Sequence, residues 1–202
     1  MPLPDLPEQF NAVAALMDSH IAAGRGAKPA ILCGDQTITY QQLYENVNRV
    51  GNALLKLGVR MEQRVATLLP DCPEVVYVFL GAMKIGAVSI PLNTMLVAKD
   101  YKYLLNDCRA HVLVVAPSLL HHVMEVREHL NYLEHIVVAG PDHEGPLILS
   151  ELMAAASPKL EPANTSKDDS AFWLYSSGTS GGSKAAIHLH HDMIFAADLY
   201  AQ

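Results

Sequence analysis

The sequence predicts an α/β fold, a layered sandwich in which a mostly parallel sheet is flanked by helices. One observation is a set of short, continuous apolar runs of strand length, namely QRVATLLP, AVSIPL, HVLVVA and HIVVAG. A second is that segments with helical spacing separate these runs, and apolar strands that alternate with helices form parallel sheets covered on both faces. A third is that 202 residues, 50% of them hydrophobic and 17% charged, suffice for a core.

The N-terminal segment predicts a helix and a hairpin. Over residues 8–22 the apolar side chains recur at the spacing of one helix face. The runs AILCG and TITY then predict two short strands around the turn-forming pair Gly34-Asp35.

Two long helices follow, and local end signals delimit both. Thr39 predicts the N-cap of the first helix, Gln42 completes a capping box, and Gly58 ends the helix. Pro73 opens the second helix in its first turn, and Gly86 closes it.

The rest of the chain repeats the alternation. From 141 to 170 the composition shifts toward Pro, Ser, Asp and Lys, which predicts a surface crossing with a helical island near 150–156. A loop then separates the predicted strands AFWLYSS and KAAIHLH. The other predicted helices cover residues 99–107 and 118–130, and one begins near Asp192.

The stretch YSSGTSGGSK, residues 175–184, holds three glycines, five Ser and Thr hydroxyls and one lysine. Backbone N–H groups that converge in a glycine-rich turn form an anion-binding nest, and a lysine adds a point charge for phosphate oxygens. The stretch therefore predicts a polyphosphate site. It is not a Walker A loop, because Ser183 stands where that motif needs glycine and Ala185 where it needs Ser or Thr. The alternative from composition is a flexible surface hairpin.

The same stretch resembles the phosphate-loop signature of the acyl-adenylate-forming (AMP-dependent synthetase/ligase) superfamily. That signature runs Ser/Thr-Ser-Gly-Ser/Thr-Thr-Gly-x-Pro-Lys-Gly, with a histidine six residues after the lysine. The segment from TYQQL to LNTML is similar to the superfamily's N-terminal region, and DSHIAAGRGAKPAIL and DDSAFWLYSSG look most like benzoate-CoA ligase and related aryl-CoA ligases. The residues that fall on the signature are Ser176, Ser177, Gly178, Thr179, Gly181, Lys184 and His190.

Three positions depart from the signature. Ser180 replaces threonine and keeps a hydroxyl. Ser183 replaces proline, which loosens the loop by roughly 0.4–1 kcal/mol through chain entropy. Ala185 replaces glycine, and a positive φ at this position would cost on the order of 1–2 kcal/mol.

The resemblance implies an ATP-dependent acyl-CoA ligase for a small-molecule carboxylate, most like benzoate. In the family reaction the carboxylate attacks the α-phosphorus of Mg-ATP, pyrophosphate leaves, and the thiol of coenzyme A displaces AMP from the acyl-adenylate. ATP, Mg²⁺ and the co-substrate coenzyme A are thus implied. The residues implied to bind the ATP phosphates are Ser176, Ser177, Gly178, Thr179, Ser180, Gly181 and Lys184, and His190 is implied to lie near the acyl pocket.

By the same resemblance, residues 1–202 form an incomplete N-terminal AMP-binding (adenylation) domain, and the C-terminal domain is absent. The adenine contacts, the magnesium-binding glutamate, the aryl pocket and the adenylation lysine come later in the family. We therefore assign no catalytic residue within the chain and expect no turnover from it alone. The helix near Asp192 reaches the last residue without a cap, glycine or proline, which favours truncation. Two alternatives stay open: a truncated, non-catalytic nucleotide-binding paralogue, or an enzyme that adenylates a fatty or amino-acid carboxylate.

Charge and composition exclude other classes of protein. Twenty-one acidic and 14 basic residues give a net charge of -7 without any Lys/Arg run, so we expect no nucleic-acid partner. The N-terminus lacks a signal-peptide pattern and no apolar stretch reaches membrane-spanning length, so we expect a cytoplasmic protein. Cys33, Cys72 and Cys108 form no CxxC pair and predict reduced, mostly buried thiols. The sequence leaves the oligomeric state open.

The histidine-rich run after the loop is the other candidate binding group. His188, His190 and His191 would need one or two further convergent ligands to form a zinc site. On a strand, His188 and His190 would share one face and His191 would oppose them. We therefore predict no metal site here.

Three more groups predict packing rather than chemistry. Tyr101 and Tyr103 would point to different faces of a helix, and we assign both to packing. Asp168-Asp169 predicts a solvated turn before a strand. Cys72 at a helix start could be a stabilised thiolate, but it has no histidine partner in sequence and we predict a structural thiol.

Overall fold

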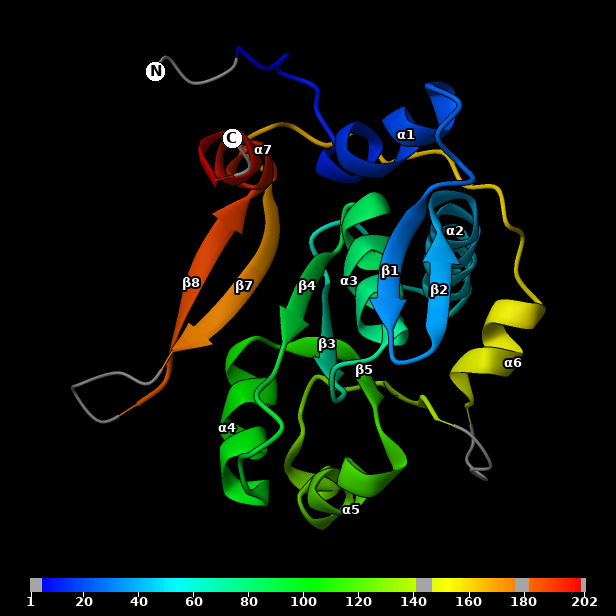
Figure 1. Ribbon diagram of the computed structural model, residues 1–202. Coiled ribbons are helices and arrows are strands. Elements are labelled where there is room, and N and C mark those ends of the chain that lie inside the picture. The colour runs from blue at the N-terminus through cyan, green and yellow to red at the C-terminus, as the bar shows by residue number, and fades with distance from the viewer. Residues whose placement is uncertain (1–4, 141–146, 177–181, 201–202) are drawn as a thin grey trace.

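The centre of the molecule is a six-stranded sheet, seen in a computed structural model that describes residues 5–140, 147–176 and 182–200 (Figure 1). The strand order is β6-β5-β3-β4-β7-β8. The first five strands in this order are parallel, and β8 is antiparallel to β7. The strands are β3 (Arg64–Leu68), β4 (Val88–Pro91), β5 (Ala110–Val115), β6 (His135–Val138), β7 (Ser170–Ser176) and β8 (Lys184–Leu189).

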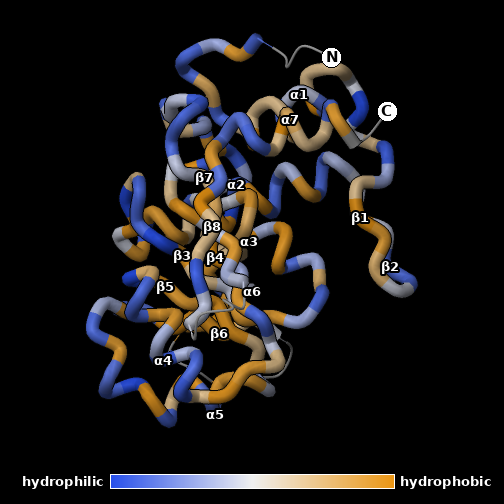
Figure 2. The backbone as a smooth tube through the Cα atoms, turned by 90° about the vertical axis from the view of Figure 1, so that its left-hand side faces the viewer, coloured by the Kyte–Doolittle hydropathy of each residue, from blue (hydrophilic) through white to orange (hydrophobic). Residues whose placement is uncertain are grey.

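Helices cover both faces of this sheet, and the predicted α/β fold class is confirmed. One face is covered by α2 (Tyr40–Lys56) and α3 (Pro73–Lys84), whose Val50 and Val78 join Val65 and Val112 in one core. The other face is covered by α4 (Ala98–Asp107) and α5 (Pro117–Glu125), which share a second core with Leu113. The apolar strands lie at the centre of the molecule, between these helix layers (Figure 2).

The N-terminal helix starts later than the sequence predicts. The expected helix over 8–22 begins only at residue 12, with a π-helical turn over Ala14–Asp18 that continues into α1 (Ser19–Ala22). Residues 8–10 instead pair with the distant segment 165–167: the N–H of Phe10 donates to the Thr165 carbonyl at 2.8 Å. Because this pairing is long-range, helical spacing alone does not reveal it. The predicted hairpin follows as β1 (Pro29–Cys33) and β2 (Gln36–Thr39).

The predicted ends of the two long helices, α2 and α3, are confirmed. The N–H of Gln42 donates to the Thr39 hydroxyl at 3.3 Å, and the N–H of Thr39 donates to the Gln42 side chain at 2.9 Å. Gly58 and Gly86 follow their helices at φ values of +86° and +74°, where a side chain would be strained. The helix predicted over 118–130 is shorter: α5 stops at Glu125, and a 3₁₀ turn covers Arg127–His129.

The segment after β6 crosses the surface of α2, as its composition predicts. It contains the short helix α6 (Leu149–Ala154) and then an irregular stretch. Side chains of α2 donate to its carbonyls: Asn48 to Pro158 at 2.8 Å, and Asn52 to Ser157 and Lys159 at 2.9 Å. These side-chain amides supply hydrogen-bond donors to backbone carbonyls that belong to no helix or strand.

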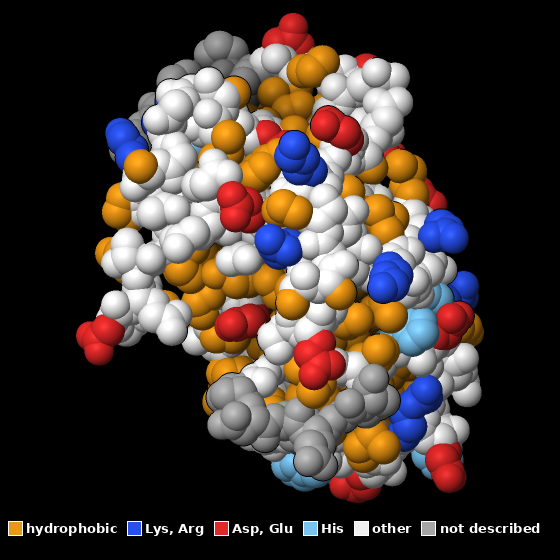
Figure 3. Space-filling model, turned by 90° about the vertical axis from the view of Figure 1, so that its right-hand side faces the viewer, with side chains coloured by type: hydrophobic (Ala, Val, Ile, Leu, Met, Phe, Trp, Pro, Cys, Tyr) orange, Lys and Arg blue, Asp and Glu red, His pale blue; other side chains and the backbone are white. Residues whose placement is uncertain are grey.

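Basic and acidic side chains are interspersed on the face shown in Figure 3. In the described ranges, no helix is long and apolar enough to span a bilayer.

Candidate functional site

The glycine-rich loop connects the two strands of an antiparallel hairpin. In the register of β7 and β8, Ser176 lies opposite Lys184 and Tyr175 opposite Ala185. Since β7 runs parallel to β4, the loop emerges at the carboxyl edge of the parallel strands, where α/β sheets bind ligands. Of the predicted phosphate-binding residues, Ser176 and Lys184 are therefore brought together at the mouth of the hairpin. The others, Ser177, Gly178, Thr179, Ser180 and Gly181, lie outside the described residues.

Helix α4 holds this end of the hairpin through two tyrosines. The Tyr103 hydroxyl donates to the Ser183 carbonyl at 3.0 Å, and the Tyr175 hydroxyl donates to a carboxylate oxygen of Asp107 at 2.5 Å. Burial, followed by the bond to the Asp107 carboxylate, raises the pKa of Tyr175, so its phenol remains a donor at neutral pH. The assignment of Tyr103 to packing is wrong: its side chain is 47% exposed and its hydroxyl contacts the loop. The assignment of Tyr101 is confirmed, since that residue is fully buried.

The substitutions at the loop exit fit the observed backbone. Ala185 is an extended residue of β8, and the non-glycine residues with positive φ in the described ranges are Glu62 and Arg109. Alanine in place of the family's glycine therefore introduces no left-handed strain. Ser183, in place of proline, has its carbonyl held by Tyr103.

His190 lies buried at the first position of α7 (His190–Tyr200). Its Nδ1 accepts a hydrogen bond from the backbone N–H of Ala12 at 3.1 Å. Burial lowers the pKa of His190 to about 4, so the ring is neutral and Nε2 carries the hydrogen. Within the described residues Nε2 has no partner. The histidine thus joins the end of the hairpin to the first helix, and its nearness to an acyl pocket stays a prediction.

The neighbouring histidines share one carboxylate partner. Nδ1 of His188 lies 3.4 Å from the Asp192 carboxylate and Nε2 of His191 lies 3.0 Å from it, while Nδ1 of His191 lies 3.0 Å from Asp168. Among the described residues, the three histidines do not form a group whose ligand atoms lie close enough together to hold one ion. The predicted turn at Asp168-Asp169 is confirmed, because the Asp169 carboxylate accepts from the N–H of Ser166 at 2.8 Å.

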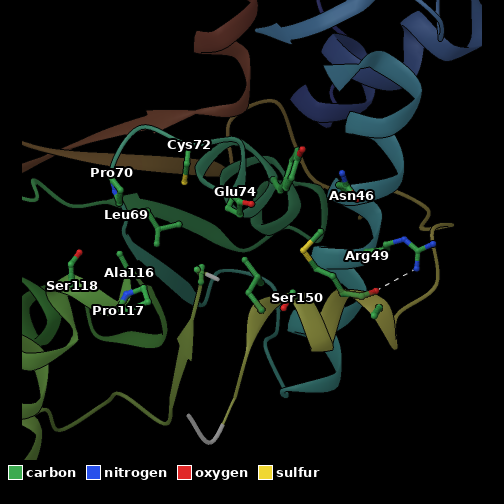
Figure 4. Close-up of a pocket in the computed structure, with 16 residues that line it drawn as sticks. Asn46, Arg49, Leu69, Pro70, Cys72, Glu74, Ala116, Pro117, Ser118 and Ser150 are labelled. Atoms are coloured by element: carbon green, nitrogen blue, oxygen red, sulfur yellow. Dashed lines mark hydrogen bonds between the residues drawn. The ribbon is translucent and has the colours of Figure 1, made fainter. Parts of the chain in front are cut away.

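A separate cavity of about 1000 Å³ opens at the carboxyl ends of β3, β5 and β6 (Figure 4). From β3 the chain enters α3 on one face of the sheet, and from β5 it enters α5 on the opposite face. Such a change of direction between neighbouring parallel strands creates a crevice in which α/β proteins bind ligands. The lining residues are Asn46, Arg49, Leu69, Pro70, Cys72, Glu74, Tyr77, Ala116, Pro117, Ser118, Ala139, Gly140, Leu149, Ser150, Met153 and Ala154.

Two of the residues that line this cavity, Arg49 and Cys72, carry polar side-chain groups. Arg49 of α2 reaches toward α6 and donates to the carbonyls of Met153 at 3.3 Å and Ala156 at 2.8 Å (Figure 4). Cys72 is half-buried, and burial raises the pKa of its thiol, which disfavours a stabilised thiolate at this position. Of the other cysteines Cys108 is buried and Cys33 is partly exposed. Sequence reasoning missed the cavity because its walls come from separate segments that share no motif.

Comparison with known proteins agrees with the phosphate-loop resemblance. The chain matches the AMP-binding enzyme family over residues 19–201. It is 40% identical over 198 residues to the benzoate–CoA ligase of Thauera aromatica, covering 98% of this chain and 37% of that protein. It is 35% identical to the 3-hydroxybenzoate–CoA/4-hydroxybenzoate–CoA ligase of the same organism, covering 94% of this chain and 37% of the relative.

Solved structures give the same result at the level of the fold. An anthranilate CoA ligase, AuaEII, in complex with anthranoyl-AMP superposes with a TM-score of 0.94 at 36% identity, covering 99% of this chain and 38% of that one. A benzoate CoA ligase from Burkholderia xenovorans LB400 superposes with a TM-score of 0.82 at 32% identity, and the match covers 95% of this chain and 37% of that one.

The predicted likeness to benzoate-CoA and related aryl-CoA ligases is thus confirmed. The chain spans about 37% of the length of the curated relatives it matches. Because the family match extends over nearly the whole sequence, the chain belongs to the AMP-binding enzyme family.

Proposed function

We propose that this chain is the N-terminal, phosphate-loop-bearing part of an ATP-dependent acyl-CoA ligase that activates a benzoate-like carboxylate. The carboxylate would be joined to AMP with loss of pyrophosphate, and the acyl group would then pass to the thiol of coenzyme A. The observation that carries the proposal is the hairpin mouth, where the signature residues Ser176 and Lys184 face each other at the carboxyl edge of the sheet. The likeness to aryl-CoA ligases supports the aromatic substrate.

The residues at the hairpin mouth fit the phosphates of ATP. The Lys184 side chain is exposed at the first position of β8, and the exposed Ser176 lies across from it. We assign Lys184 to charge pairing with the departing pyrophosphate, and residues 177–181 to hydrogen bonds with the β- and γ-phosphates through backbone N–H groups and hydroxyls. ATP supplies the electrophilic α-phosphorus and the leaving group. The chain's own contribution is positioning and charge neutralisation, on which phosphoryl-type displacement depends.

The position of Lys184 rests on the hairpin's attachment to α4. Tyr103 holds the backbone one residue before the lysine, and Tyr175, on the facing strand β7, donates a hydrogen bond to Asp107 of α4. A cation held in one place loses less freedom on meeting a transition state than a mobile one. Mg²⁺ belongs to this proposal through the family resemblance, and we assign no ligand for it within the chain.

The remaining assignments follow from the same proposal. Residues 1–202 are assigned to the N-terminal AMP-binding domain, which acts with a C-terminal domain outside these residues. His190 is assigned to the neighbourhood of the acyl pocket. Coenzyme A is the co-substrate, a small carboxylic acid is the partner, and the cytoplasm is the proposed compartment.

The test is an assay of AMP formation from ATP, benzoate and coenzyme A by a protein that contains this chain at the full length of its relatives. We expect benzoate-dependent AMP release, and a loss of about 10²–10³-fold in kcat/KM for Lys184→Ala, the range for removing one transition-state charge contact. Lys56→Ala, at an exposed site on the last turn of α2, is the matched control and should change the rate less than twofold.

The possible outcomes separate the alternatives. ATP binding without AMP release for any acid would favour a non-catalytic nucleotide-binding paralogue. Activity confined to fatty or amino acids would keep the ligase chemistry and overturn the aryl substrate. Near-normal activity of Lys184→Ala would overturn the role of this lysine.

A further inference from the structure

Three metal-ligating side chains lie together at the amino ends of β5 and β6. They are His111 of β5, His135 at the start of β6, and Glu134 immediately before β6. Nδ1 of His111 lies 3.4 Å from a carboxylate oxygen of Glu134, and the rings of His111 and His135 meet edge to face with centroids 6.1 Å apart. Among the described residues, this is the one group of His, Cys, Asp or Glu whose three ligand atoms all lie within 4.8 Å of one another.

Two paired strands hold the backbone of this group. In the parallel register of β5 and β6, Val112 lies beside His135. The N–H of Glu134 donates to the His111 carbonyl at 2.9 Å, and this hydrogen bond joins the backbones of Glu134 and His111 directly. Sites built on strands keep their geometry better than sites on loops. His111 comes immediately before the first residue of β5 that pairs with β6, and Glu134 immediately before the first residue of β6, so all three residues lie at the amino ends of two paired strands.

The exposure of the side chains suits an ion that enters from solvent. The His111 side chain is 12% exposed, whereas that of Glu134 is 63% exposed. Zinc ligands at about 2.0–2.2 Å from the ion lie about 3.3 Å from one another in a tetrahedral site. The separation of His111 and Glu134 already has this value, at 3.4 Å. All three ligand atoms lie within 4.8 Å of one another, so the longer separations would have to shorten by at most about 1.5 Å in a tetrahedral site.

The donor set selects the kind of ion. Two imidazole nitrogens and one carboxylate oxygen suit zinc and its neighbours in the first transition row, whereas Mg²⁺ and Ca²⁺ take oxygen ligands. We propose that His111, Glu134 and His135 bind one divalent transition-metal ion of the zinc class, with water in the remaining position.

This site is distinct from the phosphate loop. The hairpin loop follows the carboxyl end of β7, which is parallel to β4, so it lies at the opposite edge of the sheet from the amino ends of β5 and β6. The ion would bridge two neighbouring strands and, by binding only the folded protein, would stabilise it.

The experiment is titration of metal-free protein with Zn²⁺, followed by calorimetry and by the thermal unfolding midpoint. We expect one equivalent to bind and the midpoint to rise, and we expect no saturable binding of Mg²⁺ at this group. His135→Ala and Glu134→Gln should each weaken Zn²⁺ binding by at least tenfold. Both positions are partly exposed, so these variants keep the fold.

The matched control removes a histidine pair outside the group. The rings of His121 and His122 on α5 lie 3.9 Å apart, and the double variant His121→Ala/His122→Ala should bind Zn²⁺ as the parent does. Absence of one-equivalent binding, unchanged affinity in His135→Ala and Glu134→Gln, or loss of binding in the control pair alone would each overturn the proposal.

Discussion

The environment of His190 predicts a pH dependence of stability. Its folded pKa of about 4 lies below the value of 6.5 expected in the unfolded chain. Between these values the unfolded protein takes up a proton at His190 and the folded protein does not, so the free energy of unfolding falls as the pH drops from 6.5 to 4. The size of this contribution is on the order of 2–3 kcal/mol.

Urea unfolding at several pH values measures this effect. In His190→Gln an amide oxygen can still accept from the Ala12 N–H, but the side chain does not titrate. We expect this variant to lose a large part of the fall in stability between pH 6.5 and 4. His121→Gln, at an exposed position on α5, should keep the parent's pH profile. An unchanged profile in His190→Gln would contradict the assignment.

At the residue scale, sequence reasoning identified the polar signature and missed the contacts that support it. The spacing of Ser176 and Lys184 in the loop is local, and so the family pattern detects it. The partners of His190 and Ser183 are Ala12 and Tyr103, which lie far away in the chain. No spacing rule relates such positions, because they meet only once the sheet has formed.

The attachment of the hairpin to α4 is a contact between elements, and Tyr103→Phe tests it. The variant removes one hydrogen bond, from the Tyr103 hydroxyl to the Ser183 carbonyl, and keeps the ring. One hydrogen bond contributes a net free energy of about 0.5–1.5 kcal/mol. If this free energy helps to hold the loop in its ATP-binding position, its loss should raise the KM for ATP of the proposed ligase roughly 2–13-fold.

The KM for the carboxylate should not change, since the contact concerns the phosphate loop alone. Tyr132→Phe, which removes the hydroxyl of another exposed tyrosine, is the control. Steady-state kinetics with each substrate varied in turn gives both constants. Equal changes in both KM values, or none, would show that Tyr103 does not position the loop.

The contact between α2 and α3 depends on a close approach at Gly81. A Cβ at this position would lie 3.0 Å from a methyl group of Val50 and 3.1 Å from the Val47 carbonyl oxygen. The carbonyl belongs to the α2 backbone and moves only with that helix. Gly81→Ala should therefore lower the free energy of unfolding by about 1–3 kcal/mol, although alanine is the better helix former.

A second substitution tests the cause of that loss. Gly81→Ala combined with Val50→Ala frees space at the contact, so the two losses should sum to more than the loss of the double variant. Urea denaturation of the parent, both single variants and the double variant gives the coupling energy. A stabilised Gly81→Ala variant would contradict the close approach.

At the element scale, local signals account for what could be predicted. The capping box at Thr39, the proline at Pro73 and the glycines at Gly58 and Gly86 act over a few residues, and all mark the observed ends. The helix predicted from residue 8 failed because Phe10 bonds to Thr165 instead. A long-range backbone pairing of this kind overrides helical spacing.

At the scale of the whole molecule, apolar strands alternating with helices predicted the parallel sheet but not its strand order. The order β6-β5-β3-β4-β7-β8 sends α3 and α5 to opposite faces. The cavity at the carboxyl ends of β3, β5 and β6 results from that order. Neither periodicity nor composition contains this information, because both describe single segments and the cavity is formed by several.

The 202-residue chain should not catalyse adenylation by itself. It carries the predicted phosphate loop but spans about 37% of the relatives' length, and adenylation also requires groups that hold the base, the magnesium ion and the acid in line with the α-phosphorus. We expect no benzoate-dependent exchange of labelled pyrophosphate into ATP by residues 1–202. The full-length protein of the proposed ligase, assayed in parallel, should exchange. Measurable exchange by the short chain that is lost in Lys184→Ala would mean that the hairpin and its neighbours suffice for the first half-reaction.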